Sequence, residues 1–284
     1  MVLSGTSMYV GASVGVLLFD AIAPAGVAWL RVAASALVLV VLVRPPAPAW
    51  RGRPLALAAV FGVVTALMNV CFYEAVARLP LGTAVAIEFL GPIAVVAAES
   101  RSARGLSALA AAIAGVALIA DVQFAAEPLG IAFALLAAAL WAGYVLLGKA
   151  VSDAAGADRR ASLHSLAVGW TAAAVLTSPL AISLSRADPH VGLHRVAGMV
   201  AALAVLSSVV PYLLDQQVLR LVGRGHFALL LAVLPASAVL AGLLMLGQIP
   251  TRPELIGIAL VVVALVVSDH RRSRPHPRAA RRAA

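Results

Sequence analysis

Residues 55–98 read LALAAVFGVVTALMNVCFYEAVARLPLGTAVAIEFLGPIAVVAA. This stretch contains two long apolar runs, 55–77 and 80–98, which meet at a turn beside Pro80. An α-helix needs about 20 apolar residues to cross the hydrocarbon core of a bilayer, and each run is of that length. A short turn makes neighbouring helices antiparallel. The stretch therefore predicts a hairpin of two transmembrane helices.

The rest of the chain has the same composition as this hairpin. Of its 284 residues, 63% are hydrophobic and 12% are charged. A soluble domain has about 45–50% apolar and about 25% charged residues. Only helices and closed barrels satisfy their backbone polar groups in lipid, and continuous apolar runs favour helices. The composition therefore predicts an all-α integral membrane protein.

Ten apolar segments follow one another along the chain, the fifth and the tenth being the shortest. They are 2–19, 26–43, 55–77, 80–98, 106–121, 130–148, 162–184, 196–219, 226–247 and 254–268. Their connections are short, so successive helices should run antiparallel. We therefore expect ten transmembrane helices.

The distribution of basic residues sets the expected orientation. If the N-terminus is cytoplasmic, 16 of the 21 Lys and Arg residues lie in cytoplasmic loops or in the C-terminal tail, and four lie on the opposite side. Cytoplasmic loops of membrane proteins are enriched in Lys and Arg. We therefore expect both termini in the cytoplasm, with residues 270–284 as a basic cytoplasmic tail. Since topology accounts for the net charge of +9, we expect no nucleic-acid partner.

The two ends of the chain are unlike each other. No basic residue precedes Arg31, which argues against a secretory signal peptide. Either the first helix is short or the protein begins upstream of Met1. The basic tail is either a solvated segment that fixes topology or a contact with anionic lipid.

The two halves of the sequence resemble each other weakly. One offset aligns Gly15 with Gly148 and Arg31 with His164, and a slightly larger offset aligns Gly82 with Gly225 and Pro92 with Pro235. Each half then holds five helices, and because five is odd, the second half is inverted in the membrane. Two inverted repeats are the architecture of many secondary transporters. We expect the first repeat at 1–125 and the second at 126–269.

Glu88 lies near the middle of a predicted span, whereas the other acidic residues fall nearer to helix ends or in loops. An ionised carboxylate at mid-membrane costs at least about 2.5–3.5 kcal/mol, so it must be protonated, paired or in contact with water. The functional interpretation is an acid that couples protons to transport or contacts a substrate. The alternative is a polar clamp between two helices, although Ser, Thr or Asn would serve that purpose more often.

Asn69 and Tyr73 are the expected neighbours of Glu88. Asn69 lies about as far before the turn at Pro80 as Glu88 lies after it, so both fall near the midplane. Tyr73 is one helical turn from Asn69 on the same face. Arg31, five residues into the second segment, either snorkels to the outer interface or turns inward to a carboxylate.

Candidate helix breakers occupy matching positions in the fourth and ninth segments. They are Pro92, which follows Gly91, and Pro235. Paired interruptions point to the central site of a transporter, whereas an ordinary kink only aids packing. Three aromatic residues, which either line a cavity or pack against neighbouring helices, are Trp141, Tyr144 and Tyr212.

The sequence lacks the residues that several classes of chemistry require. A single cysteine, Cys71, excludes an intramolecular disulfide and any multi-cysteine metal site. The sequence has no His-Glu-x-x-His motif, no Ser-His-Asp arrangement and no phosphate-binding loop. We therefore expect no enzymatic activity, no cofactor and no bound metal.

The stretch from Asn69 to Pro92 carries a family pattern. It contains Asn69, Phe72-Tyr73, Pro80-Leu81-Gly82 and Glu88-Phe89-Leu90-Gly91-Pro92 in that order. This pattern resembles the EamA family of the drug/metabolite transporter superfamily, most closely its threonine/homoserine exporter branch. Weaker matches in register along nearly the whole chain are Gly11-Ala12-Ser13 with Leu18-Phe19, Gly26-Val27 with Leu30-Arg31, Trp141-Ala142 with Tyr144, and Pro211-Tyr212.

The resemblance implies a ten-helix exporter in a bacterial inner membrane. Such a protein moves small amino acids outward by alternating access, in exchange for protons. The positions carried over from the family are Glu88, Asn69, Tyr73 and Arg31. The implied partners are a small-molecule substrate, protons and membrane lipid, and a homodimer is an alternative to a monomer.

Three positions depart from the exporter pattern. Val16 stands where the exporter has a lysine, and Leu234 and Gln248 stand where it has acidic residues. These changes bear on substrate identity and on proton coupling. The alternatives are therefore an EamA-type carrier or efflux protein for another small metabolite or drug and, less favoured, a membrane-embedded enzyme.

Overall fold

The structure, a computed structural model, describes residues 2–100, 102–123, 127–156, 159–186, 192–211, 214 and 233–269. Every regular element within these ranges is helical. The α-helices are α1 (Val2–Val16), α2 (Pro24–Val43), α3 (Gly52–Val76), α4 (Leu81–Glu88), α5 (Leu90–Ser100), α6 (Ala103–Gln123), α7 (Pro128–Ala155), α8 (Arg159–Leu176), α9 (Leu193–Ala204), α11 (Val233–Leu246) and α12 (Arg252–Asp269). Shorter elements are the 3-10 helices η1 (Ala47–Trp50) and η2 (Ser178–Arg186) and the π-helical turn η3 (Val205–Val209).

The expectation of an all-helical protein is confirmed, and each of the ten apolar segments contains a helix. The two shortest segments, 106–121 and 254–268, form α6 and α12, which extend beyond them at both ends. Helices long and apolar enough to cross a membrane are Pro24–Val43, Gly52–Val76, Leu81–Glu99 and Pro128–Ala154. Shorter apolar helices are Ala103–Ile119, His194–Ser208 and Val233–Leu246.

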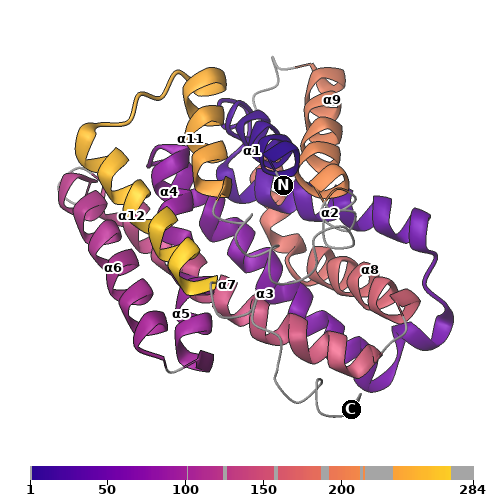
Figure 1. Ribbon diagram of the computed structural model, residues 1–284. Coiled ribbons are helices and arrows are strands. Elements are labelled where there is room, and N and C mark those ends of the chain that lie inside the picture. Colours follow the sequence, from indigo (N-terminus) through magenta and orange to yellow (C-terminus); the bar gives the residue numbers. More distant parts are fainter. Residues whose placement is uncertain are drawn as a thin grey trace, which may run out of the picture.

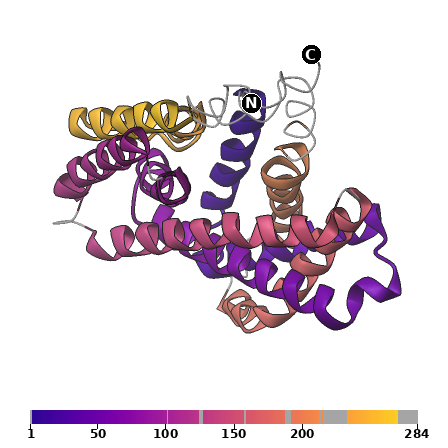
Figure 2. The ribbon, with the colours of Figure 1, turned by 60° about the horizontal axis from the view of Figure 1, so that its bottom comes forward.

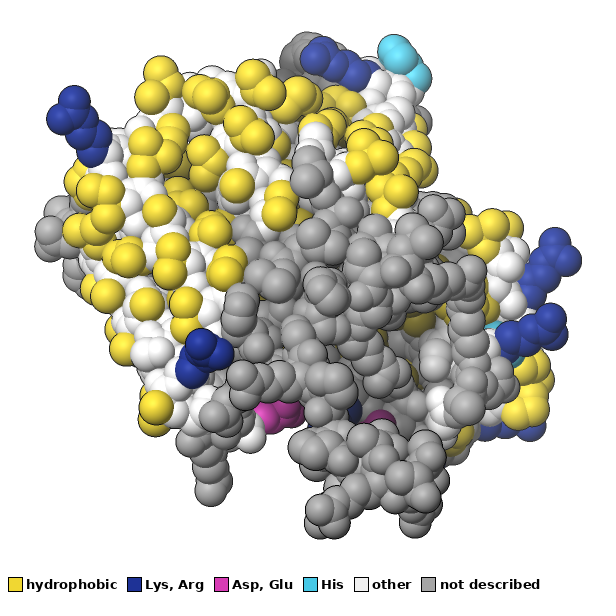
Figure 3. All heavy atoms as spheres, viewed as in Figure 1, with side chains coloured by type: hydrophobic (Ala, Val, Ile, Leu, Met, Phe, Trp, Pro, Cys, Tyr) yellow, Lys and Arg dark blue, Asp and Glu magenta, His cyan; other side chains and the backbone are white. Residues whose placement is uncertain are grey.

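The surface of the molecule is apolar where a soluble protein would be charged. Large hydrophobic side chains such as Leu37, Leu135 and Leu244 are exposed. Figure 3 shows hydrophobic side chains spread over the face that carries α11 and α12, with Lys and Arg at its margins. An exposed apolar surface of this extent is suited to contact with lipid.

The long helix α3 packs along both α7 and α8, while α6 packs along α12 (Figures 1 and 2). The helices α4 and α5 lie between α7 on one side and α6, α11 and α12 on the other. A methyl group on Gly62 of α3 would overlap the carbonyl of Gly169 of α8. Glycine at this crossing lets the two backbones touch, as small residues do at many membrane helix interfaces.

Close contacts of the same kind join other helix pairs. Gly91 of α5 lies directly against the carbonyl of Ala138 in α7. Gly5 of α1 lies against Leu234 of α11, where an added Cβ would be 2.7 Å from the leucine side chain. Position 234, which is acidic in the exporter pattern, is thus part of a packed interface between α1 and α11.

The fourth apolar segment is divided into α4 and α5 at Phe89, three residues before Pro92. Proline has no N–H, so Pro92 cannot donate the α-helical hydrogen bond to the carbonyl of Glu88. The acidic residue therefore lies at the end of α4, beside the interruption. Pro235 lies within α11, and Pro92 is the third residue of α5. The residues that directly precede Val233 lie outside the described ranges.

Candidate functional site

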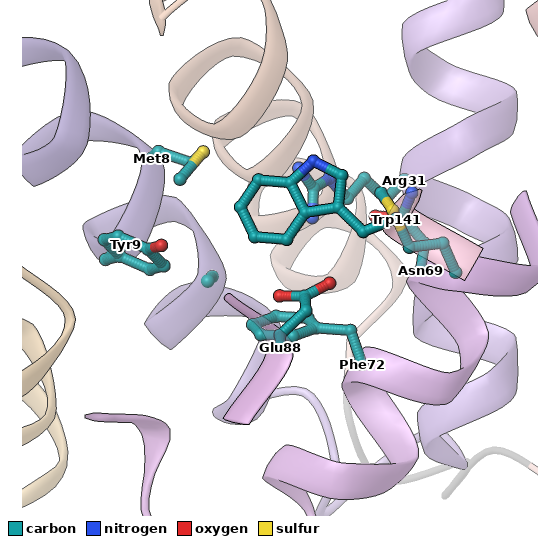
Figure 4. Close-up of a pocket in the computed structure, with 9 residues that line it drawn as sticks. Met8, Tyr9, Arg31, Asn69, Phe72, Glu88 and Trp141 are labelled. Atoms are coloured by element: carbon teal, nitrogen blue, oxygen red, sulfur yellow. The ribbon is translucent and has the colours of Figure 1, made fainter. Parts of the chain in front are cut away.

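A cavity of about 110 Å³ lies where α4 meets α1, α2, α3 and α7. A cavity of this size has room for several water molecules. Figure 4 shows Met8 and Tyr9 of α1 on one wall and Asn69 on the opposite wall, with Glu88 between them. The lining residues are Met8, Tyr9, Ala12, Arg31, Met68, Asn69, Phe72, Glu88 and Trp141.

Glu88 contributes a carboxylate to this cavity. Its side chain is only 7% exposed and points toward the space beneath the Trp141 indole (Figure 4). Within the described ranges, the carboxylate has no hydrogen bond and no ion pair. An acid that clamps two helices together would form a hydrogen bond between its carboxylate and the neighbouring helix. The geometry therefore favours an acid that faces a cavity over an acid that holds two helices together.

Asn69 is held in place by its own helix. Its Nδ2 donates to the Thr65 carbonyl at 2.8 Å, and Thr65 Oγ1 donates to the Phe61 carbonyl at 2.8 Å. Both residues are buried on the face of α3 that points inward. Asn69 and Glu88 line one cavity, in agreement with their similar distances from the turn at Pro80.

Arg31 turns inward rather than toward the outer interface. Its side chain lines the cavity, and its Nη2 donates to the Ser207 carbonyl in η3 at 3.2 Å. Pro211 lies four residues after Ser207 and has no N–H, so it cannot donate an α-helical hydrogen bond to the carbonyl that accepts from Arg31. The Arg31 Cζ atom also lies 6.0 Å from the centre of the Tyr73 ring. None of the described carboxylates forms an ion pair with Arg31.

The aromatic candidate residues take different positions relative to the cavity. Trp141 lines the cavity and packs edge-to-face on Phe89, with ring centres 4.7 Å apart. Tyr144 is outside the cavity lining and packs on Phe61 at 4.9 Å. Tyr73 is fully buried beside Arg31, next to the cavity rather than in its wall. The remaining aromatic candidate, Tyr212, lies outside the described residues.

The contribution of α1 to this site was not among the sequence-based expectations. Met8, Tyr9 and Ala12 line the cavity. Tyr9 and Met8 precede Ala12 by three and four residues, so the three side chains lie near one face of α1. This spacing could have indicated from the sequence that α1 contributes to the cavity. Ser207 was also missed, because a backbone position in a π-helical turn has no simple sequence signature, although π turns are common at functional sites.

A second polar cluster joins the two halves of the chain near the start of α4. Gln248 Oε1 accepts a hydrogen bond from the Leu81 backbone N–H at 2.9 Å. Glu254, which is 1% exposed, accepts from the Thr83 hydroxyl at 2.9 Å and from the Thr251 backbone N–H at 2.7 Å. Gln248 therefore accepts a hydrogen bond at the N-terminus of α4, a role that an acidic side chain could also fill. Thr251 and Glu254 have the Thr-x-x-Glu spacing of a capping box, and this spacing could have identified the buried acid.

The described residues contain no group of three or more His, Cys, Asp or Glu side chains placed to hold a metal ion. What the structure provides instead is a multi-pass helical membrane protein with a small cavity, lined by two charged side chains in a largely apolar wall, beside an interrupted helix. Interrupted helices beside a central cavity that contains charged groups are a feature of secondary transporters. The fold and the site therefore define a membrane transporter.

Comparison with known proteins agrees with this class. Residues 128–268 match the model of the EamA-like transporter family. The chain is 32% identical over 266 residues to the threonine/homoserine exporter RhtA of Escherichia coli (strain K12), covering 89% of this chain and 84% of the relative. It is 30% identical over 275 residues to RhtA of Salmonella typhimurium (strain LT2), covering 93% and 88%. The chain belongs to the EamA-like transporter family, which is a family of transporters and not of enzymes.

The fold itself also has a solved counterpart. A crystal structure of a protein that is 18% identical superposes with a TM-score of 0.54, covering 96% of this chain and 97% of that one. At this level of identity the similarity concerns the fold alone.

Proposed function

We propose that this chain exports small zwitterionic amino acids, such as threonine or homoserine, from the bacterial cytoplasm by alternating access. The observation that carries the proposal is that Glu88 and Arg31 line the same cavity without forming an ion pair within the described structure. The names of the relatives, which are threonine/homoserine exporters, give the substrate class.

The two charges fit an amino acid because they are opposite and separate. A carboxylate binds an ammonium group, and a guanidinium binds a carboxylate with directed hydrogen bonds. A charged group in the membrane interior is costly unless it is paired or hydrated. A zwitterion in the cavity supplies each charge with its partner, so the site is better satisfied with substrate than without it.

Proton coupling follows from the same carboxylate. Glu88 is able to hold either a proton or the ammonium group of a substrate, because both occupy the carboxylate oxygens. Release of the ammonium group on the outer side would free Glu88 to take up a proton, and release of that proton inside would restore the site. We therefore propose exchange of substrate for protons through Glu88.

The ten-span architecture with two inverted repeats is also part of the proposal. The offset that aligns Gly15 with Gly148 relates Gly5 to Ala138, and the offset that aligns Pro92 with Pro235 relates Gly91 to Leu234. The contact of Gly5 with Leu234 is therefore the counterpart of the contact between Ala138 and Gly91. Two contacts related in this way support repeats at 1–125 and 126–269, each of five helices.

The orientation follows the basic residues. We propose an inner-membrane protein with both termini in the cytoplasm, because 16 of the 21 Lys and Arg residues then lie on the cytoplasmic side. The basic segment 270–284 would be a cytoplasmic tail near anionic lipid. A homodimer stays a prediction that oligomeric-state measurements in detergent can test.

A second candidate substrate class is a more apolar metabolite or drug. Apart from its charged residues, much of the cavity wall is apolar, and it includes Met8, Met68 and Phe72. Methionine side chains are flexible and adapt to differently shaped ligands. An efflux protein of broader specificity would use the same cavity.

Efflux from whole cells distinguishes the two candidates. Cells expressing the chain are loaded with a panel of labelled amino acids, and loss of label is compared with cells carrying an empty vector. We expect faster loss of threonine or homoserine in the expressing cells. Export of none of the amino acids would reject the amino-acid assignment and favour the second candidate.

A further inference from the structure

Three hydrogen-bond donors beside the cavity have no acceptor in the described part of the chain. They are Arg31 Nε, the Tyr73 hydroxyl and the Ser207 hydroxyl, and all three atoms are buried. Arg31 connects them, because its Nη2 bonds to the Ser207 carbonyl at 3.2 Å and its Cζ lies 6.0 Å from the centre of the Tyr73 ring. The three donors therefore belong to one neighbourhood.

Buried donors without acceptors destabilise a folded protein, so a native structure seldom retains three together without a reason. Donors grouped around a guanidinium call for an acceptor that carries negative charge. A carboxylate is such a group, since when ionised it only accepts hydrogen bonds and has two oxygens to share among several donors. Glu88 faces the same cavity and is not ion-paired with Arg31, so within the described residues no side chain supplies this acceptor, and the carboxylate of a ligand fits the place.

We propose that Arg31, Tyr73 and Ser207 form the carboxylate half of the substrate site, opposite Glu88, and that Ser207 determines specificity for carboxylate-bearing substrates. The inference rests on the proposed function, because it assigns one end of the exported zwitterion to these residues. Arg31 and Tyr73 come from the first half of the chain and Ser207 from the second. Both halves therefore contribute to binding the carboxylate.

The helix α1 covers two of these donors in the present conformation. Gly11 lies directly against the Ser207 hydroxyl, and an added Cβ on Gly15 would be 2.8 Å from the Tyr73 hydroxyl. Gly11 and Gly15 are four residues apart, so they share one face of α1. A shift of α1 away from η3 would uncover both hydroxyls for a bound carboxylate, while Arg31 already lines the cavity.

Binding to the purified protein tests the proposal with two matched probes. L-Threonine carries both charges, whereas L-threoninol keeps the ammonium group and replaces the carboxylate by an alcohol. We expect Ser207→Ala to weaken L-threonine binding about tenfold, the loss of a hydrogen bond to a charged group. We expect L-threoninol binding, weaker from the start, to stay unchanged in this variant.

Ser208→Ala is the matched control. Ser208 lies in the same π turn, but its hydroxyl is hydrogen-bonded to the Ser35 hydroxyl at 2.9 Å. This variant should bind L-threonine as the wild type does. Tyr73→Phe should also weaken L-threonine binding, and Ser207→Ala should not lower Tm, because it removes a hydroxyl that lacks a partner within the described structure.

The outcomes separate the inference from the proposed function. Wild type that binds no L-threonine would reject the amino-acid assignment and the inference with it. If the wild type binds L-threonine and Ser207→Ala binds it with the same affinity, the carboxylate half-site is overturned and the proposed function stands. Equal weakening of L-threonine and L-threoninol would also overturn it, because a general disturbance of the cavity then explains the loss.

Discussion

Arg31 of α2 donates a hydrogen bond to the main-chain carbonyl of Ser207, 176 residues further along the chain. This contact joins the first half of the protein to the second beside the cavity that also contains Glu88. Pro211, four residues after Ser207, has no N–H and cannot donate an α-helical hydrogen bond to this carbonyl. Pro92 has the same relation to the carbonyl of Glu88, so a proline lies four residues after each of these two site residues.

Replacing Arg31 by lysine tests the geometry of this contact. Lysine keeps the positive charge but lacks the planar fork that can hold the Ser207 carbonyl and a second acceptor together. We expect Arg31→Lys to raise KM for L-threonine about tenfold, the equivalent of one charge-assisted hydrogen bond. Initial transport rates over a range of L-threonine concentrations measure this. Full activity in Arg31→Lys would mean that a point charge is sufficient at this position.

Replacing Glu88 by glutamine tests proton coupling. Glutamine has nearly the same shape as glutamate but neither carries the charge nor takes up a proton. We expect Glu88→Gln to abolish substrate efflux driven by an imposed pH gradient, and any residual exchange to be independent of pH. Glu99→Gln is the control, because Glu99 pairs with Lys149 at 3.9 Å on a partly exposed part of the surface. Normal pH-driven efflux in Glu88→Gln would remove the coupling role.

The crossing of α3 and α8 gives a prediction about stability. A methyl group on Gly62 meets the backbone carbonyl of Gly169, which cannot turn aside as a side chain could. We expect Gly62→Ala to destabilise the protein by about 1–3 kcal/mol, the usual effect of overpacking. Gly198→Ala is the control, since nothing lies within 4 Å of an added Cβ there. Its Tm should be unchanged or higher, and equal Tm values in the two variants would contradict the described crossing.

The buried cluster at Glu254 gives a second stability prediction. Thr83→Val keeps the side-chain shape but removes the donor at 2.9 Å from the Glu254 carboxylate. We expect a loss of about 1–3 kcal/mol, seen as a lower Tm in detergent. Thr171→Val is the comparison, because the Thr171 hydroxyl bonds its own helix, at the Ala167 carbonyl. Equal Tm shifts would mean that the bond between α4 and α12 adds no stability.

Much of the fold could be predicted because it depends on local sequence. Apolar runs long enough to cross a membrane specify helices whatever their neighbours do, and α6 and α12 form even where the runs are short. The meeting of Asn69 and Glu88 in one cavity was predictable for the same reason, since a single turn fixes their relative depth. The sequence alone does not decide whether the Arg31 side chain points to the outer interface or inward. Its inward direction depends on a contact with η3, which lies far away along the chain.

The parts that could not be predicted depend on contacts between distant segments. Nothing local in the sequence distinguishes Ser207 from Ser208, yet one faces α1 and the other bonds to Ser35. From the sequence, Gln248 is the loss of an acidic residue, but the structure gives it a capping role at the start of α4. Tyr144, for which the sequence allows both a cavity and a packing position, lies against Phe61 outside the cavity wall.

The central claim is that the cavity holding Glu88 and Arg31 binds both ends of one amino acid. Counterflow of labelled L-threonine in proteoliposomes tests it, with unlabelled competitors that each lack one charge: L-threoninol without the carboxylate and 3-hydroxybutyrate without the ammonium group. We predict that unlabelled L-threonine abolishes uptake of label, whereas either competitor at the same concentration leaves most of it. Competition by L-threoninol or 3-hydroxybutyrate as strong as that of L-threonine, or no counterflow of L-threonine at all, would contradict the account.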